Sequence, residues 1–361
     1  MRILFGSAPK VRHRDGAIEP EAGDYVWILL VDRANSRVIP EMSNDSSAPL
    51  CSPRVAPHSH YRGRLAPSPT GYLHLGHART FWIAFERAVE RNGTLILRNE
   101  DLDPDRSKPE LSSAMIEDLR WLGIDWQEGP DVGGPFAPYD QSQRRTLYAD
   151  ALRRLAEREL IYPSACSRKE IERVAQAPNQ GDEESLYPGT CRARCVADAQ
   201  KFLDETLEGP SRGKSSSHSP RPPNWRFRVP DGECVSFVDG CFGPQSFVAG
   251  RDFADFVVWR HDGVPSYQLA VVVDDAAMRI TEIVRGADLL LSTARQLLLY
   301  RALGRPAPDF YHCPLVTDEQ GNRLAKRHDS RSLRALRNRG VTAAEIRRSW
   351  VNGNAPLPAS L

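Results

Sequence analysis

Short unbroken runs of apolar residues alternate with helically spaced ones along much of this chain, which predicts an α/β fold. The stretch 62–97 shows the pattern most clearly. Residues 64–66 end a strand, a proline-rich loop and a helix follow, and residues 94–97 are apolar enough for a strand buried on both faces. Such a βαβ unit is half of a Rossmann fold. Asn92-Gly93 ends the helix. Its expected core face comprises Ala78, Phe81, Trp82, Phe85 and Val89.

Two further helices are expected in the first half of the chain. Ser107 and Glu110 have the spacing of a capping box, Pro109 suits the first helical position, and Gly123 ends the helix. The next helix opens at residues 139–144. The buried face of the first helix is expected to comprise Leu111, Met115, Leu119 and Leu122, and that of the second Leu147, Ala151, Leu152 and Leu155.

The second half begins with an unbroken apolar run at 267–275, which predicts a central parallel strand because continuous apolar character indicates burial on both faces. Residues 280–284 predict the next strand. Two short helices are expected near the end of the chain, the second opened by a capping box of Thr342 and Glu345. The helix between these regions is expected to pack through Leu297, Leu298 and Leu303.

A β-rich insertion separates the two halves. Its short alternating strands are expected at 225–229, 234–237, 245–248 and 256–259. Residues 209–223 are turn-rich and of low complexity, which is typical of a flexible surface segment. The chain is therefore expected to divide into five segments: 1–60, a disordered extension without an assigned function; 61–160, the first Rossmann half; 161–260, the inserted subdomain; 261–330, the second Rossmann half; and 331–361, a short helical end.

Charge and cysteine content narrow the class of protein. The 361 residues carry a net charge of +1 at pH 7, so gross charge does not attract nucleic acid, and any basic surface must be local. One local concentration exists between Arg323 and Arg348, a stretch that contains nine basic residues and only two acidic ones. The seven cysteines are odd in number, and neither a secretory signal nor a membrane-spanning apolar run is present. These features predict a reducing, cytoplasmic location.

The candidate chemistry lies where the first loop meets its helix. His74 and His77 flank Leu75 and Gly76 at the expected helix N-terminus, where free backbone N–H groups and the helix dipole favour an anion such as phosphate. Two imidazoles add donors, and Gly76 lets a flat nucleobase approach the backbone. A four-residue motif of this kind, taken alone, more often marks two surface histidines at a helix start than a binding site. A second element at 323–327, reading RLAKR, reverses that balance.

The pair of elements resembles the HIGH and KMSKS signatures of class I aminoacyl-tRNA synthetases, in the glutamate and glutamine branch. Lys326 stands at the second lysine of the latter, whereas Arg323 and Ala325 replace its first lysine and its serine. The resemblance implies a class I synthetase Rossmann fold that uses ATP with Mg²⁺. It also implies that His74, Gly76, His77 and Lys326 bind ATP and that His74, His77, Arg323 and Lys326 promote catalysis.

The same resemblance implies two further sites. The L-glutamate pocket would comprise Arg64, Ala66, Ser68, Glu100, Tyr267 and Arg285. The inserted acceptor-binding subdomain would hold a zinc knuckle, and Cys166, Tyr187 and Cys191 occupy matching places. Ser164, however, stands where the first cysteine is expected, and a neutral hydroxyl is a poor zinc ligand. We therefore expect incomplete zinc binding unless Cys195 fills the gap.

The resemblance covers roughly residues 62–350, and little chain follows for the anticodon-binding domain of full-length relatives. It is closest to a truncated branch of the family, which activates glutamate and attaches it to the queuosine base in the anticodon loop of tRNA(Asp). The basic run 323–348 and the strands around 225–228 would grip that loop, with no obligate protein partner. Two alternatives remain open from sequence: charging of a tRNA 3′ end, and a non-catalytic tRNA-binding paralogue.

Overall fold

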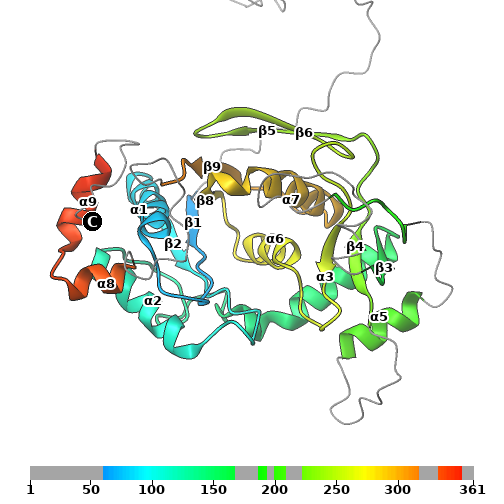
Figure 1. The fold of residues 1–361 in the computed structure, drawn as a ribbon, viewed down its shortest axis with the longest axis horizontal. Coiled ribbons are helices and arrows are strands. Elements are labelled where there is room, and N and C mark those ends of the chain that lie inside the picture. Colours follow the sequence, from blue (N-terminus) through cyan, green and yellow to red (C-terminus); the bar gives the residue numbers. More distant parts are fainter. Residues whose placement is uncertain (1–59, 167–185, 193–198, 209–221, 317–331, 352–361) are drawn as a thin grey trace, which may run out of the picture. The chain divides into compact units, whose positions relative to one another are not determined.

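The computed structural model describes residues 60–166, 186–192, 199–208, 222–316 and 332–351 (Figure 1). The expectations for the N-terminal extension, for residues 209–221 and for the RLAKR element at 323–327 lie outside the described residues. In the described part of the chain, helices and strands alternate as an α/β fold. No helix within it is long and apolar enough to cross a membrane.

The predicted βαβ unit is confirmed. β1 (Arg62–Leu65) pairs in parallel with β2 (Thr94–Leu97), and α1 (Leu75–Glu90) connects them. α1 buries small residues such as Ala84 and Ala88, and Phe81, Trp82 and Phe85 are only partly buried. The prediction was wrong for Val89, which is 58 % exposed. Because the alanines form the inner face of α1, which lets the helix approach the strands closely, Val89 next to Ala88 faces solvent.

Two other helices begin or face differently from their prediction. α2 (Pro109–Leu122) has Lys108 as its N-cap, in an extended conformation and without a side-chain cap bond, so the Ser107 capping box was wrong. The physical reason is that Pro109 forces the preceding residue out of the helical region, which places Ser107 one residue too early. Gly123 ends the helix at φ 89°, as expected. After η1 (Gln141–Arg144), α3 (Arg145–Glu157) buries Tyr148 and leaves Leu147 41 % exposed, against expectation.

The apolar run at 267–275 is a helix rather than the predicted central strand. α6 (Tyr267–Ala277) begins at Ser266, whose Oγ accepts a hydrogen bond from the Leu269 N–H. Leu269, Ala270, Val271 and Val272 are buried, and so are Asp274 and Asp275 near its end. A helix that is buried around most of its circumference shows no polar face, so its sequence has the same unbroken apolar character as a buried strand.

The remaining strands form two sheets. β3 (Ile161–Ser164), β4 (Asn224–Phe227) and β7 (Phe256–Trp259) form an antiparallel sheet, beside which lies α5 (Ala199–Glu208). The second sheet has the order β6-β5-β9-β8. In it, the hairpin of β5 (Cys234–Asp239) and β6 (Gly243–Val248) continues in parallel through β9 (Asp309–Cys313) to β8 (Glu282–Gly286). The strands expected at 225–229, 234–237, 245–248 and 256–259 are thus present.

The helices after β8 complete two hydrophobic cores. η2 (Ala287–Leu289) leads into α7 (Leu290–Ala302), which packs with α3, α6 and the strands β4 and β7 in one core. α8 (Leu333–Asn338) and α9 (Ala343–Val351) pack with α1 and α2 in the other, beside which Figure 1 shows them. The capping box of Thr342 and Glu345 is confirmed, because each donates a backbone N–H to the other's side chain.

Candidate active site

The site is built where β1, β2 and β8 end side by side. The Arg98 N–H donates to Leu65 O at 2.8 Å and the Glu100 N–H to Pro67 O at 3.0 Å, so the loop after β1 is fastened to the end of β2. On the other side, the Arg64 guanidinium donates to the backbone oxygen of Val284 in β8 at 3.0 Å. Ligands of α/β sheets bind at such carboxyl ends of strands. Ala66 lies half-buried and Ser68 exposed in this loop.

The HLGH element forms the N-terminus of α1, as predicted. His74 is the N-cap, and its Nδ1 accepts the Gly76 N–H at 3.1 Å, so the neutral ring carries its hydrogen on Nε2. The rings of His74 and His77 stack with centroids 3.8 Å apart. A β-carbon at Gly76 would lie 3.0 Å from the His74 ring, so glycine keeps this ring arrangement undisturbed. Two imidazoles therefore stand together at the positive end of a helix dipole.

Both chain segments that flank the RLAKR element lie against HLGH. Before it, the Val316 Cβ lies 4.0 Å from the position of a β-carbon at Gly76. After it, Ser332 forms a β-bridge with His74, and the Leu333 N–H donates to Leu73 O at 2.7 Å. Residues more than 230 positions apart in sequence are thereby joined at one point. The described residues on either side of the second signature element thus both lie against the first.

A buried ionic network lies at the ends of β1 and β2, beneath the candidate site. Arg98 is fully buried and pairs with Asp275 at 2.5 Å and with Glu100 at 3.0 Å. Arg64 lies 3.5 Å from the same Asp275. Burial raises the pKa of Glu100, an effect that the positive charge of Arg98 opposes. A carboxylate with a buried, partly compensated charge at a strand end is suited to bind a substrate ammonium group.

Arg285 and Tyr267 lie next to each other at the end of β8, which forms another wall of the candidate site. Arg285 stands at the end of β8 and is 4 % exposed, and its Nη1 lies 3.5 Å from the hydroxyl of Tyr267 at the start of α6. The guanidinium donates to Thr293 at 2.6 Å and to Gln296 at 2.8 Å. Burial lowers its pKa, and an arginine guanidinium keeps its charge in proteins. Of the sequence-predicted residues that the structure describes, Arg64, Glu100 and Arg285 thus line the ends of adjacent strands.

Sequence reasoning missed the residues that support this wall. His312 and Asp239 contact each other at 2.6 Å, and His312 contacts Arg285 at 3.1 Å. Asp274, which is also buried, belongs instead to the network around Arg98, and it accepts from Arg144 at 2.7 Å and from Tyr148 at 2.9 Å. The only sequence signal was the presence of Asp274-Asp275 at the end of an apolar run, and an isolated aspartate or histidine in a strand carries none.

The expectation that the strands around 225–228 grip nucleic acid was wrong for two of their residues. Trp225 and Arg226 are buried, and Arg226 donates to Asp255 O at 3.1 Å and stacks over the Tyr187 ring at 3.9 Å. Their side chains hold the antiparallel sheet together instead. In the described part of the basic run, Arg337, Arg339 and Arg348 of the α8–α9 region are exposed.

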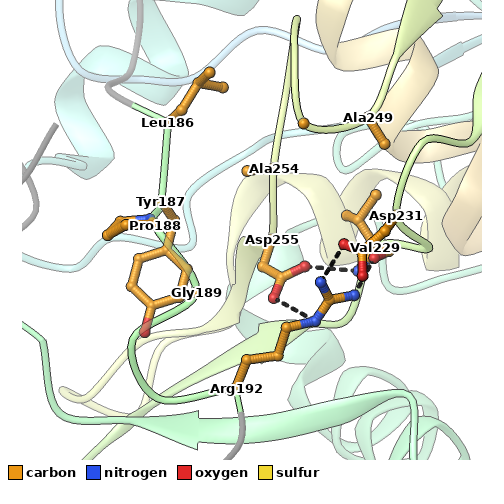
Figure 2. Close-up of a pocket in the computed structure, with 11 residues that line it drawn as sticks. Leu186, Tyr187, Pro188, Gly189, Arg192, Val229, Asp231, Ala249, Ala254 and Asp255 are labelled. Carbon is orange, nitrogen blue, oxygen red and sulfur yellow. Dashed lines mark hydrogen bonds and ion pairs between the residues drawn. The ribbon is translucent and has the colours of Figure 1, made fainter. Parts of the chain in front are cut away.

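A cavity of about 360 Å³ lies between the antiparallel sheet and the segment 186–192 (Figure 2). None of the candidate active-site residues described above lines it. Its charged side chains pair with one another. Arg192 reaches Asp255 at 3.4 Å and also contacts Asp231. Because its charges are already compensated, this cavity offers no catalytic group, and we assign it no part in the chemistry.

The four positions of the expected zinc knuckle do come together beside this cavity. The sulfurs of Cys166 and Cys191 lie 3.2 Å apart, and the Tyr187 hydroxyl lies 3.6 Å from Cys166 and 3.4 Å from Ser164. Although burial opposes it, hydrogen bonding to Tyr187 and Cys166 lowers the pKa of Cys191 to about 7. The 3.2 Å between the two sulfurs is shorter than the roughly 3.8 Å between thiolates of a tetrahedral zinc site, and a neutral Ser164 does not complete the ligand set. No cluster of three metal-ligating residues occurs among the described residues.

We expect the purified protein to hold less than one tightly bound zinc per chain, because the site provides two thiolates where structural zinc takes four ligands. Ser164→Cys is expected to raise the zinc content measured by elemental analysis, and Ser164→Ala, which adds no thiol, is the matched control. Stoichiometric zinc in the unaltered protein would contradict this and would point to Cys195 as a further ligand.

Comparison with known proteins agrees with this geometry. Residues 60–349 match the family described as tRNA synthetases class I (E and Q), catalytic domain. Glutamyl-Q tRNA(Asp) synthetase of Nitratidesulfovibrio vulgaris is 50 % identical over 285 residues, which is 79 % of this chain and 83 % of that protein. The protein of the same name from Symbiobacterium thermophilum is 49 % identical over the same shares. The crystal structure of glutamate-tRNA synthetase from Elizabethkingia anophelis superposes with a TM-score of 0.63 at 32 % identity, covering 74 % of this chain and 53 % of that one.

The fold and the site therefore define a class I tRNA synthetase catalytic domain of the glutamate and glutamine type. The chain spans about half the length of the glutamate-tRNA synthetase that it resembles in structure, but most of the length of the two glutamyl-Q relatives. With half of the aligned residues identical, the chain belongs to the glutamyl-Q tRNA(Asp) synthetase family.

Proposed function

We propose that this protein activates L-glutamate with ATP and transfers the glutamyl group to the queuosine base in the anticodon loop of tRNA(Asp). In the first step the α-carboxylate of glutamate attacks the α-phosphorus of ATP and pyrophosphate leaves, which gives glutamyl-adenylate. In the second step a hydroxyl of the modified base attacks the acyl carbon, and AMP leaves. The observation that carries the proposal is the junction of HLGH with both flanks of the RLAKR element.

The two signature elements would share the first step. His74 and His77 at the N-terminus of α1 would donate to the phosphates of ATP, with Gly76 leaving room for the nucleotide. Arg323 and Lys326 of the RLAKR element, which lie outside the described residues, would add positive charge for the same phosphates. Positioning and charge stabilisation are the main requirements of such a displacement, since the protein supplies little covalent chemistry. Mg²⁺ would accompany ATP through the phosphates, as is usual for this ion.

The amino acid would lie between the ends of β1, β2 and β8. Glu100 would accept the substrate ammonium, and the fork-shaped guanidinium of Arg285 would pair with the side-chain carboxylate, with Tyr267 at the mouth. Arg64, Ala66 and Ser68 would line the remaining wall. We further propose that the inserted strands serve as an acceptor subdomain with a degenerate knuckle, and that the helical end α8–α9 contacts tRNA without a protein partner.

The test is glutamate-dependent exchange of labelled pyrophosphate into ATP in the absence of tRNA. His77→Ala is expected to lower this exchange rate by about 10² to 10³, the usual effect of removing one donor to a developing charge. Folding should persist, because the side chain is only half-buried. His60→Ala is the matched control, since His60 is exposed and contacts Thr94 instead. A normal rate in His77→Ala would reduce HLGH to a helix cap, and no exchange in the unaltered protein would refute activation.

A further inference from the structure

Three side chains from three adjacent strands form a buried row behind the pocket wall. Arg285 of β8 and His312 of β9 are register partners, so their side chains share one face of the sheet. Asp239, at the end of β5, is the next in the row. His312 Nδ1 lies 2.6 Å from Asp239 Oδ2, and His312 Nε2 lies 3.1 Å from Arg285 Nε. All three are at most 4 % exposed.

We propose that His312, oriented by Asp239, is a positioning residue for Arg285: it accepts the Nε–H of the guanidinium and thereby aims the remaining N–H groups at the substrate carboxylate. This inference rests on the proposed function, since it concerns the residue that binds glutamate there. It assigns a role to two residues outside the substrate pocket.

Hydrogen bonding determines which nitrogen of His312 carries the hydrogen. Asp239 accepts the backbone N–H groups of Cys241 at 3.0 Å, Phe242 at 2.9 Å and His312 at 3.0 Å. These donors and the His312 ring lower the pKa of Asp239 against the effect of burial, so it is a carboxylate and can only accept. His312 Nδ1 must therefore donate. Burial and the nearby charge of Arg285 lower the pKa of His312 to about 4, so the ring is neutral at pH 7 and its Nε2 is an acceptor.

With His312 Nε2 as an acceptor, three neutral acceptors bind the side of the guanidinium that faces away from the substrate, here called its inner edge. Arg285 donates its Nε–H to His312, one Nη2 hydrogen to Thr293 and one Nη1 hydrogen to Gln296. Thr293 Oγ1 lies 3.0 Å from His312 Nε2, so the Thr293 hydroxyl can donate to the same ring nitrogen while its oxygen accepts from Arg285. The outer edge, where Tyr267 stands 3.5 Å from Nη1, is left to meet a carboxylate. A buried guanidinium without such inner acceptors would lose both orientation and solvation.

The neutrality of this acceptor distinguishes Arg285 from Arg98, another buried arginine of the site. Arg98 is paired directly with carboxylates of Asp275 and Glu100, which compensate its charge. The described side-chain partners of Arg285 are all neutral, with the charge of Asp239 one imidazole ring away. A neutral acceptor holds the guanidinium in place without competing with the substrate carboxylate for its charge.

The first experiment uses Asp239→Asn in the full chain. The amide oxygen would keep the backbone N–H groups, so the amide nitrogen would face His312 Nδ1 and force the hydrogen onto Nε2, against Arg285. We expect the KM for glutamate in pyrophosphate exchange to rise about 10- to 100-fold, with the KM for ATP changed less than about twofold. Asp255→Asn is the matched control, because Asp255 is also buried and accepts from Tyr162 and Val229, but in the other sheet.

A pair of His312 variants keeps the test decisive if Asp239→Asn folds poorly. His312→Gln retains an acceptor near the Nε2 position and should stay within a few-fold of the unaltered KM for glutamate. His312→Asn retains only the donor towards Asp239 and should raise that KM like Asp239→Asn. A purely structural role would instead make both variants affect stability and the two KM values alike, and that result would overturn the inference.

Nitrogen-15 spectra of histidine-labelled protein test the geometry without any activity measurement. At pH 7 the unaltered chain should show His312 as the Nδ1–H tautomer and Asp239→Asn should show Nε2–H. An imidazolium or an Nε2–H tautomer in the unaltered chain would overturn the inference. Exchange that never depends on glutamate, with the expected tautomer observed, would instead refute the proposed function.

Discussion

tRNA(Asp) that carries queuosine but lacks its 3′ CCA end is expected to accept glutamate, and complete tRNA(Asp) without queuosine is expected to accept none. The difference is all-or-none, because the first molecule has no terminal adenosine to acylate and the second has no hydroxyl on a modified base. The expectation follows from the family to which the chain belongs, whose named members act on tRNA(Asp) and span little more than this catalytic domain.

The physical basis is the way proteins read RNA. Unpaired anticodon bases can leave the stack, enter a pocket and be recognised along their edges, whereas a helical stem offers mostly backbone. The exposed Arg337 and Arg348 of the α8–α9 region lie on helices that pack against α1, whose N-terminus carries HLGH. Phosphates held by these arginines would keep the loop near the adenylate, so binding should weaken steeply with salt.

The measurement is incorporation of labelled glutamate into each tRNA, with fully modified, complete tRNA(Asp) as the positive control. Arg337→Ala should reduce the salt dependence of binding by about one phosphate contact. Arg153→Ala is its control, because Arg153 is also exposed but lies on α3 and pairs with Asp150. Glutamate on the complete, unmodified tRNA alone would identify a 3′-end-charging enzyme. Normal exchange with no tRNA product would contradict the transfer step.

Activation is expected to favour L-glutamate over L-glutamine by about 10⁴-fold in kcat/KM for pyrophosphate exchange. Arg285 is 4 % exposed, and its described side-chain partners are neutral, so no described carboxylate hydrogen-bonds to its guanidinium and a substrate carboxylate can do so. Glutamine presents an amide, which cannot neutralise the guanidinium and places an N–H group against other N–H donors. Such polar mismatches in a desolvated site are much more costly than the loss of an apolar contact.

The same assay with Arg285→Lys tests which group discriminates. Lysine keeps the charge but loses the fork that matches a carboxylate, so exchange with glutamate should fall at least about 10²-fold and the preference over glutamine should shrink. Arg192→Lys is the matched control, because Arg192 is also held by side-chain partners, here two aspartates, but lies at the cavity that we exclude from the chemistry. Equal rates with glutamine in the unaltered protein would remove Arg285 from its role.

The sequence by itself determined the parts of this protein whose cause is local. Prolines predicted the loop before α1, and the HLGH element marked the start of this helix. Asn92, in a left-handed conformation, follows its end as predicted. The parallel pairing of β1 with β2 follows from two short apolar runs joined by a helix of fixed handedness. These features place His74 and His77 correctly, because a helix N-terminus is created by the residues that form it.

Only the tertiary structure decided what depends on burial by distant segments. The run at 267–275 became the helix α6 because neighbours cover most of its circumference, which periodicity cannot distinguish from a strand buried on two faces. Arg226, expected at a surface, is buried because β3 and β7 flank its strand. Asp239 and His312 are separated by 73 residues and acquire their roles only because β5 and β9 pair beside β8. Local sequence encodes which backbone a segment prefers, whereas the environment of a buried charge is set by the strands that the complete chain brings to either side of it.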